Sequence, residues 1–227
     1  SLVPELSTTG EQKTKPTQHS IQELRRIGIN PNIIIARSRR PLEIEAKRKI
    51  ALYANLREEY VFSNYDVDNI YRVPLILEEQ GLGDKILKLL ELENRKLDLS
   101  KWMDFVERLE RSKRFVKIAM IGKYTKLKDS YMSIVEALKH AGAYLEVKPE
   151  LIWIESTDIE SGKINLEESL SDINGAIILP GFGVRGAEGK IKAIKYLREN
   201  KIPTLGICSG LQLSAIEAAR NLLGLKD

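Results

Sequence analysis

The stretch that decides the fold of the second half of the chain is Pro203-Thr204-Leu205-Gly206-Ile207-Cys208-Ser209-Gly210-Leu211-Gln212. Its apolar run, 204–207, predicts a short buried strand. Apolar residues then recur at helical spacing and predict a helix: Leu211, Leu213, Ile216, Ala219, Leu222 and Leu223. Gly206 and Gly210 flank Cys208, the only cysteine of the chain. The pattern is therefore strand, tight turn, cysteine, helix.

This position suits a nucleophile, because a side chain on a sharp strand-to-helix turn is raised out of the sheet. The N-terminus of the following helix offers free N–H groups and the positive end of its dipole, which favour a thiolate and a developing oxyanion. The alternative is a buried structural cysteine, the commoner kind of lone cysteine. Both interpretations of Cys208 stay open on this segment alone.

A second glycine-rich loop follows another apolar strand, 176–179, and consists of Pro180-Gly181-Phe182-Gly183-Val184-Arg185-Gly186. A helical stretch, 188–200, separates the two strands, so we expect them to be parallel and to end at one edge of the sheet, where α/β sheets bind ligands. Backbone N–H groups of such a loop can bind an oxyanion. An ordinary strand-to-helix turn is the alternative interpretation.

Residues 206–212 resemble the nucleophile motif of the class I, triad-type glutamine amidotransferases, and residues 180–183 resemble their oxyanion loop. The resemblance implies that Cys208 is the catalytic nucleophile. It also implies that six further residues bind glutamine or its oxyanion: Gly181, Phe182, Ser209, Gly210, Leu211 and Gln212.

The composition predicts a soluble globular protein, with 43% hydrophobic and 30% charged residues among 227. The formal net charge of +4 permits anionic ligands such as nucleotides but does not indicate a nucleic-acid partner. A single cysteine excludes an internal disulfide and fits a reducing, cytoplasmic location. No stretch approaches the length of a membrane span and no signal peptide is visible, so no membrane partner is expected.

A candidate phosphate-binding segment lies near the start of the chain, at Lys13-Thr14-Lys15-Pro16-Thr17-Gln18-His19-Ser20. Its lysines, threonine hydroxyls and backbone N–H groups can hold phosphates, whereas a solvated basic loop is the commoner structure for this composition. Ser20 and Glu23 form the capping-box pattern, so a helix is expected to begin there and to end at Gly28.

This segment, the helix after it and the turn Arg25-Arg26-Ile27-Gly28-Ile29-Asn30-Pro31 resemble the CTP synthases, in the C-terminal part of their synthetase domain. That family also carries a class I amidotransferase, so the resemblance covers essentially all 227 residues. It implies that UTP, or CTP as feedback inhibitor, is bound across a subunit interface by Lys13, Thr14, Lys15, Pro16, Thr17 and Gln18, with Lys49 as a further contact.

The same resemblance implies that Arg37, Tyr65, Asp66 and Val67 line the ATP site, and that Arg185 and Gly186 belong to a lid associated with activation by GTP. Arg37 is expected at the carboxyl end of a buried strand, where ligand groups gather. A solvated helix face for Lys49 and a helix cap for Asp66 are the alternatives.

Alternating strands and helices predict an α/β fold with two doubly wound, parallel-sheet (Rossmann-like) domains joined by a charged linker. The expected parts are the C-terminal part of the synthetase domain at 1–92, the linker at 93–114 and the N-terminal part of the amidotransferase domain at 115–227. In the last part we expect a helix at 129–141, closed by Gly142.

A cysteine nucleophile needs a base, usually a histidine oriented by a carboxylate. His19 lies in the nucleotide segment and His140 late on an early helix, so neither is a credible partner for Cys208. In the resembled families the histidine and glutamate follow the cysteine helix, and the phosphate loop and Mg²⁺ carboxylates precede this segment. We therefore expect both domains to be incomplete, no metal ligand in this chain and no activity of the segment alone.

The resemblance implies a glutamine-hydrolysing ligase that aminates UTP to CTP with ATP and Mg²⁺, with GTP as activator and a homodimer or tetramer as the assembly. L-Glutamine would supply ammonia through a Cys208 thioester. Two alternatives stay open. One is another triad amidotransferase, and the other is a non-catalytic assembly or nucleotide-sensing module in which Cys208 is only structural.

Overall fold

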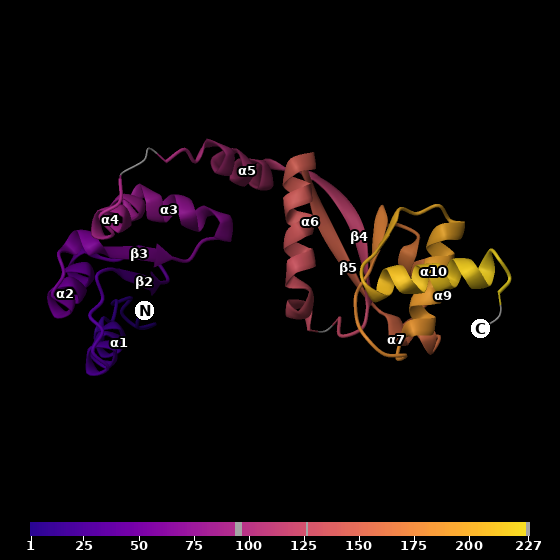
Figure 1. The fold of residues 1–227 in the computed structure, drawn as a ribbon, viewed down its shortest axis with the longest axis horizontal. Helices are drawn as coiled ribbons and strands as arrows, with labels where there is room; N and C mark the ends of the chain where they lie inside the picture. The colour runs from indigo at the N-terminus through magenta and orange to yellow at the C-terminus, as the bar shows by residue number, and fades with distance from the viewer. Residues whose placement is uncertain (94–96, 126, 226–227) are drawn as a thin grey trace. The chain divides into compact units, whose positions relative to one another are not determined.

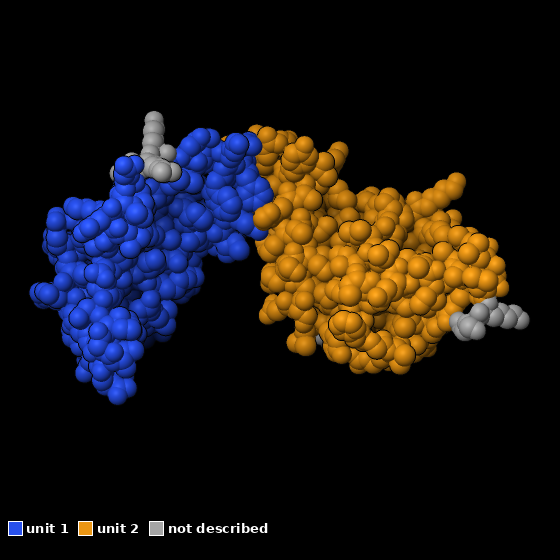
Figure 2. Space-filling view, in the orientation of Figure 1, with its two compact units in different colours: residues 1–106 blue, residues 107–227 orange. Residues whose placement is uncertain are grey.

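The structure is a computed structural model that describes residues 1–93, 97–125 and 127–225, and of residue 128 only the backbone. Two units follow one another along the chain, Ser1–Val106 and Glu107–Asp227, coloured separately in Figure 2. Residues 94–96 of the expected linker lie outside the described residues. Within the described part, no helix is long and apolar enough to cross a membrane.

The first unit is built on a parallel three-stranded sheet in the order β1-β2-β3, with β1 at Leu2–Val3, β2 at Ile34–Ser38 and β3 at Val61–Tyr65 (Figure 1). Helices α1 (Lys15–Arg26) and α2 (Ile44–Ala54) supply apolar side chains to the same core as the strands. Residues of β2 alternate between buried and exposed, so one face of this sheet carries the core: Val3, Ile21, Ile34, Ala36, Ile50, Ala51, Ala54 and Val61.

Helix α1 begins earlier than the capping-box pattern predicts, so the expected helix start at Ser20 is wrong. Thr14 is the N-cap residue, and Pro16 lies in the first turn, where its fixed φ and missing N–H are tolerated. Ser20 is inside the helix, and its hydroxyl donates to the carbonyl of Pro16 at 3.1 Å. The end is as predicted: Gly28 has a φ of +84° and its N–H donates to the carbonyl of Arg25.

A side chain covers the free edge of β3. The amide of Gln80 accepts from the N–H of Ser63 at 2.8 Å and donates to its carbonyl at 2.9 Å, as a neighbouring strand would. Among the short helices of this part of the chain, α3 (Val73–Glu79) contacts β3. The others are η1 (Glu58–Tyr60), η2 (Ile70–Arg72) and α4 (Leu82–Leu89). Helix α5 (Ser100–Arg111) follows, and its Trp102 ring nitrogen donates to the carbonyl of Tyr71 at 2.8 Å.

The second unit has four parallel strands in the order β5-β4-β6-β7 (Figure 1), with β4 at Arg114–Gly122, β5 at Val147–Glu155, β6 at Gly175–Ile178 and β7 at Thr204–Gly206. Between and after them lie η3 (Lys128–Tyr131), α6 (Met132–Leu145), α7 (Ser156–Glu160), α8 (Leu166–Leu170), α9 (Ala187–Glu199) and α10 (Ser209–Asn221). From β4 the chain continues to β5 on one side of the sheet and then to β6 on the other side. The strand order therefore reverses between β4 and β6, and parallel sheets bind ligands at such switch points.

Helices cover both faces of this sheet. Ala119 and Ile121 of β4 belong to the core cluster that includes Ala193, Ile194 and Leu197 of α9. Met120 of β4 belongs to a second cluster, against which Ile134 and Leu138 of α6 pack. The predicted α/β class with parallel sheets is therefore confirmed, and the second unit is doubly wound.

Helix α6 ends later than predicted, because Gly142 lies inside it and does not close it. A Cβ at Gly142 would lie 2.6 Å from the carbonyl oxygen of Val147. The glycine therefore permits the close approach of α6 to the start of β5. The helix stops instead at Glu146, which adopts the left-handed conformation with a φ of +54°.

Candidate functional site

Cys208 lies at the turn between β7 and α10, where its φ of +55° and ψ of −113° place it in a region that L-residues rarely adopt. Such backbone strain costs about 1–3 kcal/mol and persists only where the surroundings fix it. Here three hydrogen bonds do so: Ile207 N–H to the Ile178 carbonyl, Gly210 N–H to the Ile207 carbonyl, and Leu211 N–H to the Cys208 carbonyl. Cys208 is exposed and free, unlike a buried structural cysteine.

The two glycines beside the cysteine are sterically required. A Cβ at Gly206 would lie 2.7 Å from the backbone nitrogen of Leu211, and one at Gly210 would lie 2.2 Å from the carbonyl oxygen of Ile178. Backbone atoms cannot give way as a flexible side chain can. The sequence pattern of strand, tight turn, cysteine and helix is therefore present, but the expectation of a buried strand is wrong: Thr204 and Leu205 of β7, the last strand in the order of this sheet, are exposed.

The glycine-rich loop between β6 and α9 folds around a buried lysine that follows β4. Lys123 is 2% exposed, and its ammonium donates to the carbonyls of Phe182, Gly183 and Arg185. Gly181 has a φ of +147°, and a Cβ there would lie 2.9 Å from the Lys123 side chain. Phe182 is 91% exposed, so its ring is available to a ligand at the surface.

A second buried lysine touches both loops of the site. Lys190 of α9 is 1% exposed, and its ammonium donates to the carbonyl of Leu179 at 2.7 Å and to the hydroxyl of Ser209 at 3.5 Å. The pKa of Lys190 is lowered to about 8, chiefly by burial and also by the charge of Lys123, whereas Cys208 and Glu155 act in the opposite direction.

The predicted lid residues lie at the start of α9. Arg185 places its guanidinium 5.0 Å from the centre of the Tyr124 ring, within cation–π range. Gly186 is the N-cap residue, and its N–H donates to the Glu160 carboxylate at 2.7 Å. Leu211 and Gln212, predicted to contact glutamine, are exposed in the first turn of α10.

In the first unit, the predicted nucleotide segment forms the beginning of α1 and the residues just before it. The Thr17 hydroxyl is buried and donates to the carbonyl of Leu2 at 2.9 Å, and Gln18 donates to the Thr14 hydroxyl at 3.0 Å. These three polar side chains fix the local fold. The cations of Lys15 and Lys49 are exposed.

Lys13 and Lys49 both act electrostatically on Glu11. The ammonium of Lys13 pairs with the Glu11 carboxylate at 2.6 Å. This pair lowers the pKa of Glu11, and the charge of Lys49 adds to the effect. The structure therefore gathers two of the predicted phosphate-binding cations around one carboxylate.

Two of the predicted ATP-binding residues meet at the carboxyl ends of the strands. Arg37, near the end of β2, forms an ion pair with Asp66, which follows β3. Both line a cavity of about 540 Å³ with Leu2, Val3, Pro4, Glu5, Leu6, Ser7, Gly10, Ser38 and Arg39. Tyr65, the last residue of β3, and Val67 are the chain neighbours of Asp66.

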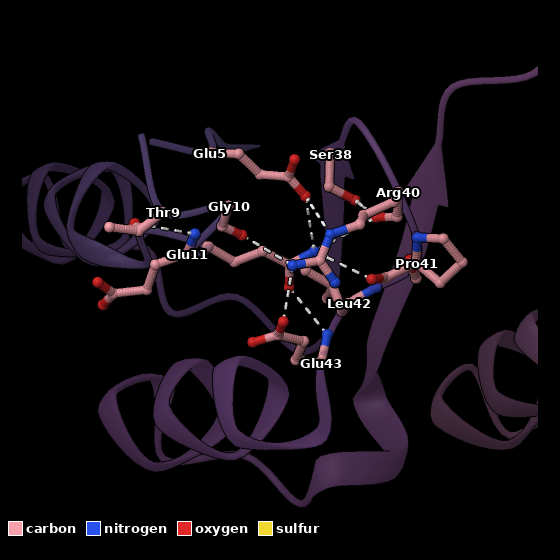
Figure 3. A network of polar contacts seen from close by, with 11 residues as sticks. Glu5, Thr9, Gly10, Glu11, Ser38, Arg40, Pro41, Leu42 and Glu43 are labelled. Atoms are coloured by element: carbon pink, nitrogen blue, oxygen red, sulfur yellow. Dashed lines mark hydrogen bonds and ion pairs between the residues drawn. The ribbon is translucent and has the colours of Figure 1, made fainter. Parts of the chain in front are cut away.

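A polar network centred on Arg40 joins the loop before the nucleotide segment to the loop after β2 (Figure 3). The Arg40 guanidinium contacts the Glu5 carboxylate at 2.8 Å, the Gly10 carbonyl at 2.8 Å and the Glu43 carboxylate at 2.7 Å. Buried Gln12 accepts from the Glu43 N–H at 2.8 Å and donates to the Pro41 carbonyl at 3.0 Å. The predicted UTP and ATP segments are thus held on one connected framework.

Comparison with known proteins gives matches in both halves of the chain. Residues 1–92 match the family described as CTP synthase N-terminus, and residues 126–227 match the class-I glutamine amidotransferases. The CTP synthase of Aeropyrum pernix is 60% identical over 227 residues, which are all of this chain and 42% of that protein. The two halves of the chain are therefore similar to two parts of the CTP synthases.

A second CTP synthase is covered to nearly the same extent. The protein of Saccharolobus solfataricus is 58% identical over 229 residues, which are 100% of this chain and 43% of the relative. A solved structure, the glutaminase domain of Trypanosoma brucei CTPS with bound acivicin, is 31% identical and covers 48% of this chain and 42% of its own, with a TM-score of 0.44. The chain spans less than half the length of the curated relatives it matches.

The two buried lysines are functional candidates that the sequence analysis missed. Lys190 lies four residues before Ile194 and seven before Leu197, both buried, so it falls on the core-facing side of α9. A lysine at such a position is a detectable signal in the sequence. For Lys123 no comparable signal exists, because its partners are carbonyls of a loop some 60 residues later in the chain.

Neither a base for Cys208 nor a metal site is found in the described residues. His19 and His140 are both exposed, on α1 and α6. Among the residues that the structure describes, no three His, Cys, Asp or Glu side chains group so as to hold a metal ion. The expectation that the Mg²⁺ ligands lie elsewhere in the protein stays a prediction.

Proposed function

We propose that this chain is part of a glutamine-hydrolysing CTP synthase in which Cys208 is the nucleophile. The carrying observation is the exposed cysteine, held at a φ of +55° between two sterically required glycines, in a chain whose other half matches the CTP synthase N-terminus. An arrangement that is strained and exposed at once is expected at a reactive residue. The proposal covers the site residues, the substrates and the assembly.

In the glutaminase reaction, the Cys208 thiolate attacks the side-chain amide carbon of L-glutamine. The new C–S bond gives a tetrahedral oxyanion, and backbone N–H groups at Gly181 and Ser209 stabilise it. The C–N bond then breaks, the departing nitrogen takes up the proton that the Cys208 thiol released on ionisation, and ammonia leaves. Water then hydrolyses the thioester to glutamate and returns a proton to the thiolate. Phe182, Gly210, Leu211 and Gln212 surround the substrate.

In the synthetase reaction, the γ-phosphoryl group of ATP is transferred to the uracil 4-oxygen of UTP, and ammonia displaces that phosphate to give CTP. Lys13, Lys15 and Lys49 supply the cations for the triphosphate of UTP or of the inhibitor CTP. Thr14, Pro16, Thr17 and Gln18 fix the backbone that carries Lys13 and Lys15. The nucleotide is bound here across a subunit interface. The cavity at Arg37 and Asp66, with Tyr65 and Val67 beside them, is the site for ATP.

The remaining proposals concern regulation and assembly. ATP is used with Mg²⁺, which neutralises phosphate charge and which we assign to ligands outside this chain. GTP activates the enzyme through the loop that contains Arg185 and Gly186, where the guanidinium already lies over the Tyr124 ring. We place the enzyme in the cytoplasm as a homodimer or tetramer.

The test is Cys208→Ala in the full-length enzyme, assayed with two nitrogen sources. We expect glutamine-dependent CTP synthesis to fall by at least a thousandfold, on the order of the loss when a nucleophile is removed, while ammonia-dependent synthesis persists. Lys195→Met, an exposed lysine on α9, is the control. Retention of glutamine-dependent activity, or loss of both activities in a folded protein, would contradict the proposal.

The two alternatives receive less support from the molecule. Another triad amidotransferase would not explain the match of residues 1–92 to the CTP synthase N-terminus. A non-catalytic module would not explain why an exposed cysteine is kept in a strained conformation. An unreactive Cys208 in the intact protein would favour the non-catalytic module.

A further inference from the structure

Lys190 occupies a buried position of α9, where an apolar side chain would be expected. Lysine side chains usually extend so that the ammonium stays in water, and a buried charge costs free energy unless it is paired. Its two hydrogen-bond acceptors are the Leu179 carbonyl and the Ser209 hydroxyl, and neither of these is a carboxylate. Ile191 and Ile194 on the same helix are buried and apolar. Packing alone therefore does not account for a lysine here.

The two acceptors belong to the two loops of the glutaminase site. Leu179 is the residue before Pro180, where the oxyanion loop begins, and Ser209 directly follows Cys208. A single ammonium thus joins the end of the β6 segment to the first residue of α10. The adjoining backbone bond, from Ile207 N–H to the Ile178 carbonyl at 3.0 Å, ties the same two segments together.

Charge at this position acts on Cys208. The interaction with Cys208 raises the pKa of Lys190, against the lowering by burial and by Lys123. The ammonium therefore lies close enough to Cys208 for the two groups to interact electrostatically. With a pKa of about 8, Lys190 is mostly charged at neutral pH.

We propose that Lys190 is a positioning residue for Cys208: its ammonium holds the oxyanion loop against the nucleophile turn and places a fixed positive charge next to Ser209, the residue that follows Cys208. This inference rests on the proposed function only in taking Cys208 as the nucleophile. The proposed role applies to the enzyme before glutamine binds. It gives a reason why a lysine is kept at this buried position despite the free-energy cost of burying its charge. Lys123, whose ammonium is bound by three loop carbonyls, shapes the oxyanion loop itself.

The test is the pH dependence of Cys208 alkylation by iodoacetamide in the full-length protein, followed by mass spectrometry of the Cys208 peptide. Only the thiolate reacts, so the profile gives the thiol pKa without any substrate. Lys190→Met removes both the charge and the donor, whereas Lys190→Gln removes the charge and keeps a donor. Lys195→Met, on the exposed side of the same helix, is the matched control.

For Lys190→Met and Lys190→Gln we expect alkylation at pH 7 to slow by about tenfold, because a shift of one pKa unit changes the thiolate fraction tenfold. The control should react like the unmodified protein. The difference should shrink above pH 8, where Lys190 loses its charge. Unchanged profiles in either variant that retains its circular dichroism spectrum would overturn the inference, so misfolding of one variant leaves the other to decide.

This readout separates the inference from the proposed function. If glutamine is not hydrolysed but alkylation still depends on Lys190, the inference stands and the proposed glutaminase falls. If glutamine-dependent synthesis is normal and alkylation ignores the charge at position 190, the proposed function stands and the inference is overturned.

Discussion

The two candidate sites of this chain are built on different physical principles. The turn at Cys208 is fixed by backbone atoms in close approach, with no space for a Cβ at Gly206 or Gly210. The nucleotide segment at the start of α1 instead presents exposed lysine cations on a helix whose position depends on side-chain hydrogen bonds. The comparison teaches that a single substitution at the Cys208 turn should abolish activity, because it causes a steric clash. At the nucleotide segment, each substitution should remove one charge and weaken nucleotide binding by a limited factor.

The largest effect that would test this contrast is expected for Gly210→Ala. The new methyl group would lie 2.2 Å from the Ile178 carbonyl oxygen, so α10 must move away from β6. We expect loss of more than 99% of glutamine-dependent synthesis in the full-length enzyme and destabilisation of the second unit by several kcal/mol, on the order of an overpacked core. Enzyme assays and thermal unfolding measure the two effects.

The matched control is Gly175→Ala, in β6 of the same sheet. A Cβ there would lie 3.3 Å from the Pro203 carbonyl oxygen, a contact that a small shift relieves. We expect at least half of the activity to remain. Equal losses for the two variants would contradict the view that the approach at Gly210 is the critical one.

A smaller effect is expected at the first site, for Lys15→Ala in the full-length enzyme. Removal of one exposed cation from a triphosphate site should weaken UTP binding by roughly fivefold to tenfold, about 1 kcal/mol, with unchanged thermal stability. The loss should diminish as salt is added, because exposed charges are screened. Calorimetric titration with UTP at two salt concentrations measures it.

Lys101→Ala, at an exposed position of α5, serves as its control and should leave UTP binding unchanged. A UTP affinity that is unaffected by Lys15→Ala, or a salt response equal in the two variants, would speak against a nucleotide site on this segment. It would also revive the alternative of another triad amidotransferase.

The sequence allowed much of the second site to be predicted, because its signals are local. Glycines at 206 and 210 around a cysteine, between an apolar strand and an amphipathic helix, specify the turn within ten residues. The parallel strands and the glycine-rich loop follow from equally short patterns. The α/β class could therefore be derived without knowledge of distant contacts.

The errors arose where local rules compete or where contacts are long-range. The capping box at Ser20 was overruled by Pro16, in the first turn of α1, which begins five residues earlier at Lys15. Glycine is typical of a helix end, but Gly142 lies inside α6, where the absence of a side chain permits close packing on the start of β5. Lys123 escaped detection because its partners come from a loop far along the chain, and the Arg40 network joins residues up to 35 positions apart.

The central claim, that Cys208 is a strained, exposed nucleophile, is tested most directly by acid quenching of the full-length enzyme during turnover of L-glutamine, with mass spectrometry of the Cys208 peptide. The account predicts a glutamyl thioester on Cys208, present in the unmodified enzyme and missing in Cys208→Ala. Turnover of glutamine without any adduct on that peptide, or with an adduct on another residue, would contradict it.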